Sequence, residues 1–307
     1  MQTLQRRQFL QRTAGLFLAT LGAASFTHNK GNPLLSFSTL GCPDWTLEQI
    51  IRFATQNGYA GLEVRGIQRE LYLPKSPVFN TPQAIAATLR QLKDANLKFV
   101  NLGASAALHH SNIRERQKNL DEAKAFIDLA NALSCPFIRV FPNDFPKDQD
   151  RQATIDLIVN GLLELGNHAK GSKVTVLMES HGQVVHSKDL EQIMTAATHA
   201  HVGLVWDIVN MWAVTKEKPA EVYRKLKPFI RHTHIKDLNF VNGKEQYTLL
   251  GKGEAPVFEG IDALLNDGYK GYYSFEWEKL WHPEIPEPEI ALADYSKVMQ
   301  QHFKKHA

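Results

Sequence analysis

Short apolar runs alternate with amphipathic segments along most of the chain. The apolar runs are rich in β-branched and aromatic residues, as buried strands are, whereas the segments between them repeat apolar residues at helical spacing. We expect strands at 34–40, 61–64, 97–102, 137–141, 173–178, 202–206, 231–237 and 272–275. We expect helices at 46–56, 81–96, 113–133, 154–169, 190–198, 220–226, 260–265 and 290–302.

Local signals mark the starts of two of these helices. Thr46 is followed three residues later by Gln49, the pattern of a capping box. Thr81 and Pro82 provide an N-cap and a proline at the first helical position. Strand and helix alternate eight times, with no hydrophobic hairpin and no linker between domains. This order predicts an α/β fold with a parallel sheet, closed into a single (β/α)8 TIM barrel.

Composition excludes several classes of protein. The chain has 307 residues, 43% of them hydrophobic, which is enough for one large core. Its formal net charge of +3 provides no broad basic surface for nucleic acid, and no apolar run is long enough to span a membrane. Cys42 and Cys135 are the two cysteines, too few for a disulfide framework or a thiolate zinc cluster. We expect both to remain unpaired.

The N-terminus has the layout of an export signal. Arg6 and Arg7 precede Phe9 and Leu10, and an uncharged run of small and apolar residues follows at 14–24. Adjacent arginines before such a run are typical of the twin-arginine type. A retained amphipathic helix is the alternative, but 14–24 has no polar face. We therefore expect a signal peptide at 1–30, a barrel at 31–307 and a periplasmic location.

Ionisable residues stand where four of the predicted strands end. The stretch R-H-T-H-I-K-D at 231–237 would place His232, His234 and Lys236 on one face of its strand, because alternate side chains share a face. The ends of three other strands carry carboxylates, so that one set of four residues would meet at the barrel mouth: Glu179, Asp207, His234 and Glu276.

These four side chains together predict a cation site. Three carboxylates that share one site repel each other and require a positive charge. Carboxylate oxygens with one imidazole and no sulfur suit manganese, magnesium or cobalt, with zinc as a further candidate. For any one acid, capping of the following helix is the simpler interpretation. Because all four residues stand at predicted strand ends that meet at one rim, we favour a shared cation site.

The chain resembles the sugar phosphate isomerase/epimerase group of the xylose isomerase-like barrels, which includes ketose epimerases and inosose dehydratases. The resemblance covers roughly residues 34–303. It is carried by G-L-E-V-R at 61–65, L-M-E-S-H at 177–181, W-D at 206–207, H-T-H-I-K-D at 232–237, G-K-G-E at 251–254 and G-Y-K-G at 268–271 with S-F-E at 274–276. The combination of H-x-H-x-K-D with G-x-G-E is specific for the group, although not for one substrate.

The resemblance implies that Glu179, Asp207, His234 and Glu276 bind one divalent metal, with manganese preferred. It also implies that Glu179 and Glu276 flank the reacting carbon as an acid/base pair. Removal of a proton next to a carbonyl requires a base beside the carbon and a metal that polarises the oxygen. Return of the proton gives epimerisation or isomerisation. Loss of a β-substituent gives elimination by a lyase or dehydratase.

Four further residues are candidates for substrate binding: His181, Lys236, His109 and Glu63. Each has an alternative: a supporting role for His181, a rim charge for Lys236, a solvated loop histidine for His109 and an internal ion pair with Arg65 for Glu63. Trp206, Trp277 and Trp281 could stack on a sugar ring, although packing is the commoner role of tryptophan. Asn210 occupies the place where related epimerases often carry histidine, a departure from their pattern.

We predict an enzyme, a metal-dependent isomerase or epimerase acting on a small sugar. A lyase acting on a keto-sugar or keto-glycoside is the second hypothesis, and an inactive sugar-binding barrel is the third. The expected export and the lack of a P-loop-like cradle favour an unphosphorylated substrate. A dimer or a tetramer is compatible with the sequence.

Overall fold

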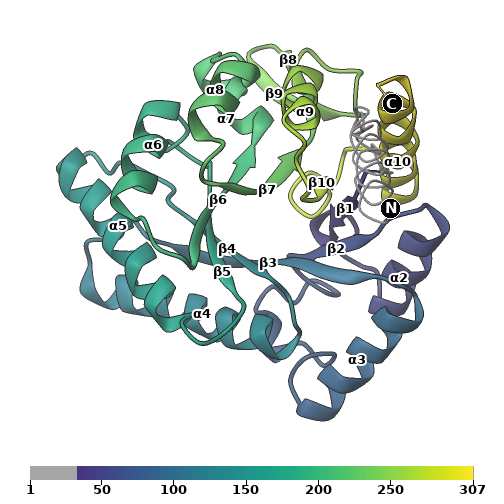
Figure 1. Cartoon of the computed structure of the whole chain (residues 1–307), viewed down its shortest axis with the longest axis horizontal. Coiled ribbons are helices and arrows are strands. Elements are labelled where there is room, and N and C mark those ends of the chain that lie inside the picture. Colours follow the sequence, from purple (N-terminus) through teal and green to yellow (C-terminus); the bar gives the residue numbers. More distant parts are fainter. Residues whose placement is uncertain (1–32, 307) are drawn as a thin grey trace, which may run out of the picture. The chain divides into compact units, whose positions relative to one another are not determined.

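The computed structural model describes residues 33–306, so the signal peptide expected at 1–30 lies outside the described residues. Eight parallel strands of the described part close into a barrel, in the order β1-β10-β7-β6-β5-β4-β3-β2 (Figure 1). They are β1 (Leu35–Ser38), β2 (Gly61–Val64), β3 (Lys98–Ala107), β4 (Phe137–Phe141), β5 (Thr175–Glu179), β6 (Val202–Asp207), β7 (Ile230–Ile235) and β10 (Tyr273–Phe275). The predicted single (β/α)8 TIM barrel is confirmed.

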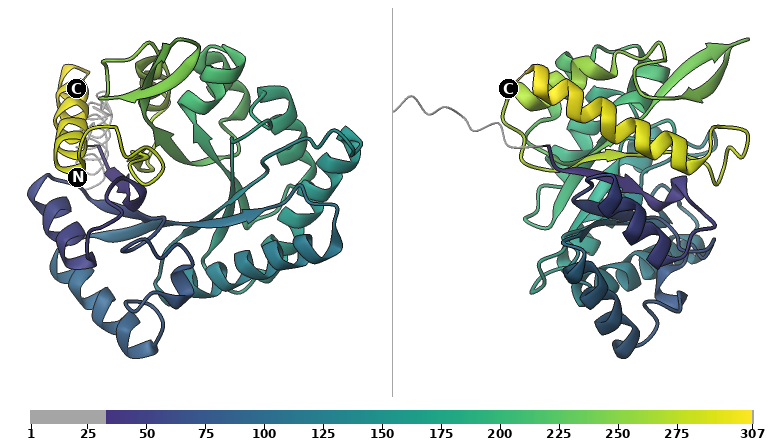
Figure 2. Two further views of the ribbon diagram at one scale, coloured as in Figure 1. Left: turned by 180° about the vertical axis from the view of Figure 1, so that it is seen from behind. Right: turned by 90° about the vertical axis from the view of Figure 1, so that its right-hand side faces the viewer.

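The α-helices surround this ring of strands (Figures 1 and 2). In chain order they are α2 (Leu47–Gln56), α3 (Pro82–Asp94), α4 (Ile113–Ala132), α5 (Arg151–His168), α6 (Ser187–Ala196), α7 (Ile208–Thr215), α8 (Pro219–Leu226), α9 (Val257–Asn266) and α10 (Pro288–Lys305). Two short 3-10 helices lie at Thr39–Gly41 and Leu73–Lys75.

The helix starts predicted from local sequence are confirmed. The Thr46 hydroxyl accepts a hydrogen bond from the Gln49 amide, and the Gln49 side chain accepts one from the Thr46 amide at 2.8 Å. Thr81 accepts from the amide of Ala84 at 3.1 Å, with Pro82 at the first helical position. These caps satisfy amides that have no partner within the helix, so each helix begins at a residue that its own sequence specifies.

Two elements were not expected from the sequence. After β7 the chain forms an antiparallel hairpin of β8 (Asp237–Val241) and β9 (Lys244–Thr248), which projects from the barrel (Figure 2, right). Its second strand, K-E-Q-Y-T, is largely polar, so hydrophobic patterning did not reveal a hairpin. The turn signal was present, however, because Asn242 and Gly243 both have positive φ, as a tight hairpin turn requires. Helix α7 was also missed, since its residues are almost all apolar and show no helical period.

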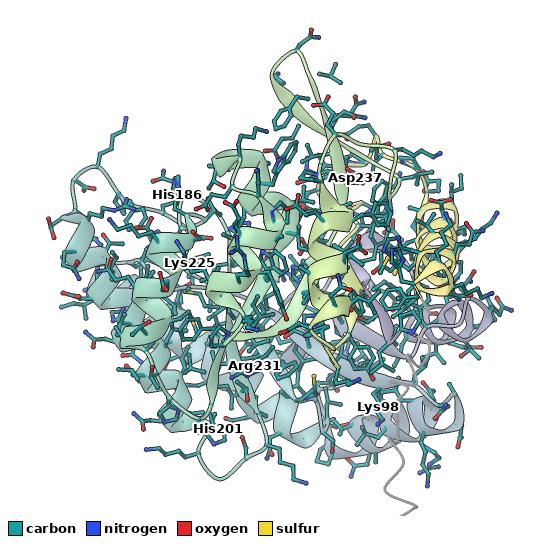
Figure 3. All side chains as sticks on the ribbon, turned by 45° about the horizontal axis from the view of Figure 1, so that its top comes forward. Lys98, His186, His201, Lys225, Arg231 and Asp237 are labelled. Carbon is teal, nitrogen blue, oxygen red and sulfur yellow. The ribbon has the colours of Figure 1, made fainter. Side chains whose placement is uncertain are left out.

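The two ends of the barrel differ in what they carry. Lys98, His201 and Arg231 lie where strands begin, at the lower end of the view in Figure 3, and Asp237 lies at the upper end, where β7 gives way to the hairpin.

Both cysteines are buried and form no disulfide, as predicted. Among the helices of residues 33–306, none combines the length and apolarity that a bilayer crossing demands.

Candidate active site

The four predicted ligands meet at the end of the barrel where the strands finish. Glu179 is the last residue of β5 and Asp207 the last of β6, where it is in register with His234 of β7. Glu276 directly follows β10. One potential ligand atom from each side chain lies within 4.8 Å of those of the other three, and all four residues are buried.

The imidazole of His234 is at the centre of this group. Its Nδ1 lies 3.1 Å from Oε1 of Glu179 and 3.2 Å from Oε1 of Glu276. Asp207 reaches the group with Oδ2, while its Oδ1 accepts hydrogen bonds from the amides of Val209 and Asn210. Asp207 therefore caps helix α7 and also belongs to the group of potential ligands.

Two carboxylate oxygens in the group have unused acceptor capacity. Glu179 Oε2 and Asp207 Oδ2 are buried without a hydrogen-bond partner. Arg139 Nε and Lys236 Nζ each lie 3.0 Å from one of them, but neither contact has hydrogen-bond geometry. Buried carboxylate oxygens with free lone pairs are the donors that a hard divalent cation takes. The residues present therefore fit a metal such as manganese or magnesium.

Lys236 supplies the positive charge next to these acids. Its ammonium donates hydrogen bonds to Glu276 and Glu278, both at 2.7 Å, and lies 3.0 Å from Asp207. Burial by itself lowers the pKa of Lys236, but Asp207, Glu276 and Glu278 outweigh it and hold that pKa well above its usual value. The lysine therefore stays charged and compensates the carboxylates around it.

Burial and the charges of neighbouring side chains together shift the pKa values of this group. Burial raises the pKa of Asp207 to about 7, opposed by Lys236 and reinforced by Glu276 and Glu179. Burial also acts against the charged form of His234, but Glu276, Glu63 and Glu179 raise its pKa well above the usual range. The pKa of Glu276 is lowered because His234 and Lys236 overcome the effect of burial. Glu276 is thus held ionised beside an imidazolium.

Glu63 has a different place from the one predicted. Its carboxylate is fully buried, lies 2.8 Å from Nε2 of His232 and 3.0 Å from Nε2 of His234, and accepts from Ser274. It does not line the cavity, where the predicted substrate contact would place it. The alternative ion pair with Arg65 is not formed either, because Arg65 bonds Ser105. Glu63 instead orients His234 so that Nδ1 faces the group, the carboxylate–histidine arrangement found behind metal ligands.

A cavity of about 400 Å³ opens beside Glu179 and Glu276. Of the other predicted substrate-binding residues, His181 and Lys236 line it. His181 is held by Asn143, whose Oδ1 lies 2.9 Å from its Nδ1. His109 does not line the cavity, and its ring packs on His110 with centroids 4.1 Å apart. The third strand continues to Ala107, farther than its apolar run indicates, so His109 lies two residues past the end of the strand.

Several cavity residues escaped prediction, among them Arg139, Tyr247 and Glu278. Arg139 lies in the middle of β4, pairs with Glu179 and covers the ring of Phe141 with its guanidinium. A charged residue inside the run F-I-R-V-F was the available signal, because a buried arginine needs a partner. Tyr247 enters from the hairpin, and Glu278 follows Glu276 on the same rim. Neither could be placed without knowing the path of the chain after β7 and β10.

A closed eight-stranded barrel with its acidic group and cavity at the carboxyl ends of the strands defines a class, the TIM-barrel enzymes whose chemistry takes place at that rim. The sequence profile of one family, the xylose isomerase-like TIM barrel, matches residues 51–299. The chain belongs to that family, and the resemblance described above is confirmed.

Two curated relatives and one solved structure illustrate the similarity. A 3-dehydroshikimate dehydratase of Bacillus anthracis is 25% identical over 228 residues, covering 69% of this chain and 76% of the relative. An inosose dehydratase of Clostridium botulinum is 22% identical over 291 residues, which cover 85% of this chain and 90% of the relative. The crystal structure of an IolI protein with a bound zinc atom superposes with a TM-score of 0.74 at 17% identity, covering 89% of this chain and 99% of that one.

Proposed function

We propose that this protein is a divalent-metal-dependent isomerase or epimerase that removes a proton next to the carbonyl of an unphosphorylated sugar or keto-sugar. One observation carries the proposal. Three carboxylates and one imidazole from four strand ends bring ligand atoms within 4.8 Å of one another, and two of these carboxylates line a cavity large enough for a sugar.

Glu179, Asp207, His234 and Glu276 are the proposed metal ligands. When bound there, a divalent ion polarises the carbonyl oxygen and makes the neighbouring C–H bond more acidic. We propose manganese, with magnesium, cobalt or zinc as alternatives, because the ligand set is mostly oxygen. The zinc in the similar IolI structure supports a divalent metal in a barrel of this fold.

Glu276 and Glu179 are the proposed acid/base pair. Both line the cavity, and they reach it from different strands, so each can act on its own side of a bound carbon. In the metal-free protein His234 and Lys236 hold Glu276 ionised, and the 2.7 Å hydrogen bond from Lys236 can do so beside a bound metal as well, as a base requires before it accepts a proton. The Lys236 ammonium can stabilise the negative charge that develops on the substrate oxygen. Return of the proton from the second carboxylate completes epimerisation or isomerisation.

Elimination is the second candidate, and it needs the same first step. Two observations favour it. Both curated relatives named above are dehydratases. In addition, Lys236 provides an ammonium donor in the cavity that can protonate a departing hydroxyl, whereas Asn210, also in the lining, cannot carry a proton as the histidine of related epimerases can.

The proposal of an unphosphorylated substrate has two supports. Two of the three cations that the described residues place at the cavity, Arg139 and Lys236, already face carboxylates of the site, and the third, Arg65, donates a hydrogen bond to Ser105. The basic leader predicted at 1–30 also indicates export to the periplasm, which remains a proposal.

Trp281 is 51% exposed at the cavity and can cover one face of a sugar ring, the usual role of an aromatic side chain at a carbohydrate site.

Proton NMR in D2O tests both candidates with the manganese-loaded protein and a panel of keto-sugars. Deuterium incorporation without loss of a substituent indicates epimerisation or isomerisation, and loss of water or of an alcohol indicates elimination. Glu179→Gln and Glu276→Gln should each abolish exchange while circular dichroism stays unchanged. Glu191→Gln, on the exposed face of α6, is the matched control and should exchange at the wild-type rate.

Exchange at the wild-type rate in either variant would remove that glutamate from the mechanism. A wild-type protein that retains no metal after dialysis and exchanges no proton with any substrate would contradict the proposed function. It would then favour the third hypothesis, a barrel that only binds sugars.

A further inference from the structure

We propose a second metal-binding site on the outside of the barrel, formed by Asp262 of α9 and by His302 and His306 of α10. One potential ligand atom from each of the three side chains lies within 4.8 Å of the other two. The site does not depend on the proposed function, because none of these residues belongs to the cavity.

The two histidines are spaced for joint coordination. Residues four apart on a helix lie one above the other on the same face, and the rings of His302 and His306 have centroids 4.4 Å apart. Two histidines at this spacing on a helix are a recurrent metal-binding arrangement. Asp262 faces them from the neighbouring helix, with Oδ1 at 2.6 Å from Nε2 of His302 and 3.9 Å from Nε2 of His306.

The hydrogen bonds of the group prepare one nitrogen for a metal. Nδ1 of His306 lies 2.8 Å from the backbone carbonyl of His302, to which it can donate only as N–H. In a neutral imidazole this leaves the lone pair on Nε2, the nitrogen directed at Asp262. A histidine whose other nitrogen is held by a carbonyl is the usual form of a metal ligand. His302 becomes a ligand when a metal replaces the proton between its Nε2 and Asp262.

The ligand types select the metal. Two imidazoles and one carboxylate suit zinc, copper(II), nickel or cobalt, whereas calcium and magnesium prefer all-oxygen sites. The site is open to solvent, because the side chains of Asp262 and His306 are 36% and 39% exposed, so water completes the coordination. The proposed ligand is therefore a late transition-metal ion bound at three protein positions.

This site lies at the barrel end opposite the cavity. Phe303, beside His302, packs on Tyr273, the first residue of β10, with ring centroids 5.0 Å apart. Figure 2 (right) shows the C-terminal end of α10 and the projecting hairpin on opposite sides of the barrel. A metal here would link α9 to the last turn of α10 and stabilise the barrel without entering the reaction, as expected for the amino-terminal rim of this fold.

An ion pair between Asp262 and a protonated His302 is the alternative. The chain contains a control for this alternative. Nε2 of His168 in α5 lies 2.9 Å from Oδ1 of Asp128 in α4, with no second histidine in the group. Within the described residues, no metal-capable group of three or more includes His168 or Asp128. A simple pair should bind no zinc, and a site of three ligands should.

The experiment is a titration of the full chain, purified without a polyhistidine tag and stripped with chelator, with zinc chloride. Calorimetry should give two zinc ions per chain for the wild type and for His168→Gln. His306→Gln and Asp262→Asn should each weaken one of the two events by at least about tenfold. Asp207→Asn should weaken the other event and leave this one intact.

Copper(II) provides a second readout. Its electron paramagnetic resonance spectrum should show coupling to two imidazole nitrogens in Asp207→Asn, and one of them should be lost when His306→Gln is added. His306→Gln should also keep wild-type deuterium exchange but lose the rise in melting temperature that the second zinc produces. Wild-type stoichiometry and affinity in both His306→Gln and Asp262→Asn would overturn the proposal, whatever number of zinc ions the wild type binds.

Discussion

The ammonium of Lys236 lies among the carboxylates of Asp207, Glu276 and Glu278 and is 1% exposed. Removing one partner of a buried ion pair leaves the other charge uncompensated, which costs about 3–5 kcal/mol. A bound divalent ion would supply that compensation instead. The stability of this protein should therefore depend on Lys236 most strongly when no metal is present.

Lys236→Met tests this dependence. We expect the free energy of unfolding in urea to fall by about 3–5 kcal/mol with chelator and by clearly less with manganese. Lys227→Met is the control, because its pair with Asp267 is 46% exposed on both sides and should contribute little to stability in either condition. Equal losses with and without metal would show that the ion does not occupy the carboxylate group.

Metal binding by the quartet should release protons. The pKa of His234 is raised well above its usual range in the metal-free protein, so its imidazole is protonated at neutral pH, and a ligand must be neutral. The apparent manganese affinity should therefore rise with pH, by about tenfold per pH unit for each proton released. Calorimetry of His306→Gln in buffers with different ionisation enthalpies measures the release. A heat independent of the buffer would contradict the assigned charge of His234.

At the scale of elements, one carboxylate joins two motifs that are separate in the sequence. Asp237 ends H-x-H-x-K-D and accepts hydrogen bonds from the amides of Gly251 at 2.8 Å and Gly253 at 3.0 Å in the G-K-G-E turn. This closes the base of the hairpin, whose second strand brings Tyr247 to the cavity. The two motifs occur together because one anchors the other.

Gly253→Ala should disturb this anchor. A Cβ at Gly253 would meet the Asp237 carboxylate and the Leu238 carbonyl at 2.5 Å or less, although φ there lies outside the left-handed region. We expect a loss of about 1–3 kcal/mol in stability and a lower kcat/KM through displacement of Tyr247. Gly243→Ala is the control at the hairpin tip. It costs stability through its φ of +75° but meets no atom within 4 Å, so its kcat/KM should remain that of the wild type.

At the scale of the molecule, the proposed chemistry and the proposed outer metal site occupy opposite rims of one barrel. The family model covers most of the described barrel, from residue 51 to residue 299. The predicted export signal at 1–30 lies outside the described residues, and its role stays a prediction.

Replacement of Arg6 and Arg7 with lysine tests the export prediction. The change keeps both charges but removes the twin-arginine pair, so a bacterial host that exports the wild type should retain the variant in its cytoplasm. Cell fractionation and immunoblotting measure the distribution. As a control, Lys304→Arg at the other end of the chain should leave export unchanged. Periplasmic recovery of the double-lysine variant at the wild-type level would exclude the twin-arginine type.

Part of this architecture could be predicted because its signals are local. Apolar runs and the caps at Thr46 and Thr81 indicated the order of strands and helices, and the ends of four strands indicated the quartet. The sequence did not reveal the hairpin, because the apolar signal is weak in its strand β9. It did not reveal α7 either, because the apolar residues there are almost unbroken. The site residues that were missed come from such places, as Tyr247 does, or carry a charge inside an apolar run, as Arg139 does.

The sequence by itself determined the order of the strands and which ionisable residues stand near the ends of four of them, since polarity along a strand is a property of neighbouring residues, and closure of a parallel barrel brings such ends to one rim. The tertiary structure alone decided the partners within that rim. Glu63 contacts His232 from a position 169 residues away, and Lys236 rather than Arg65 lies among the carboxylates. These choices depend on register and on side-chain direction across the barrel, which no local pattern specifies.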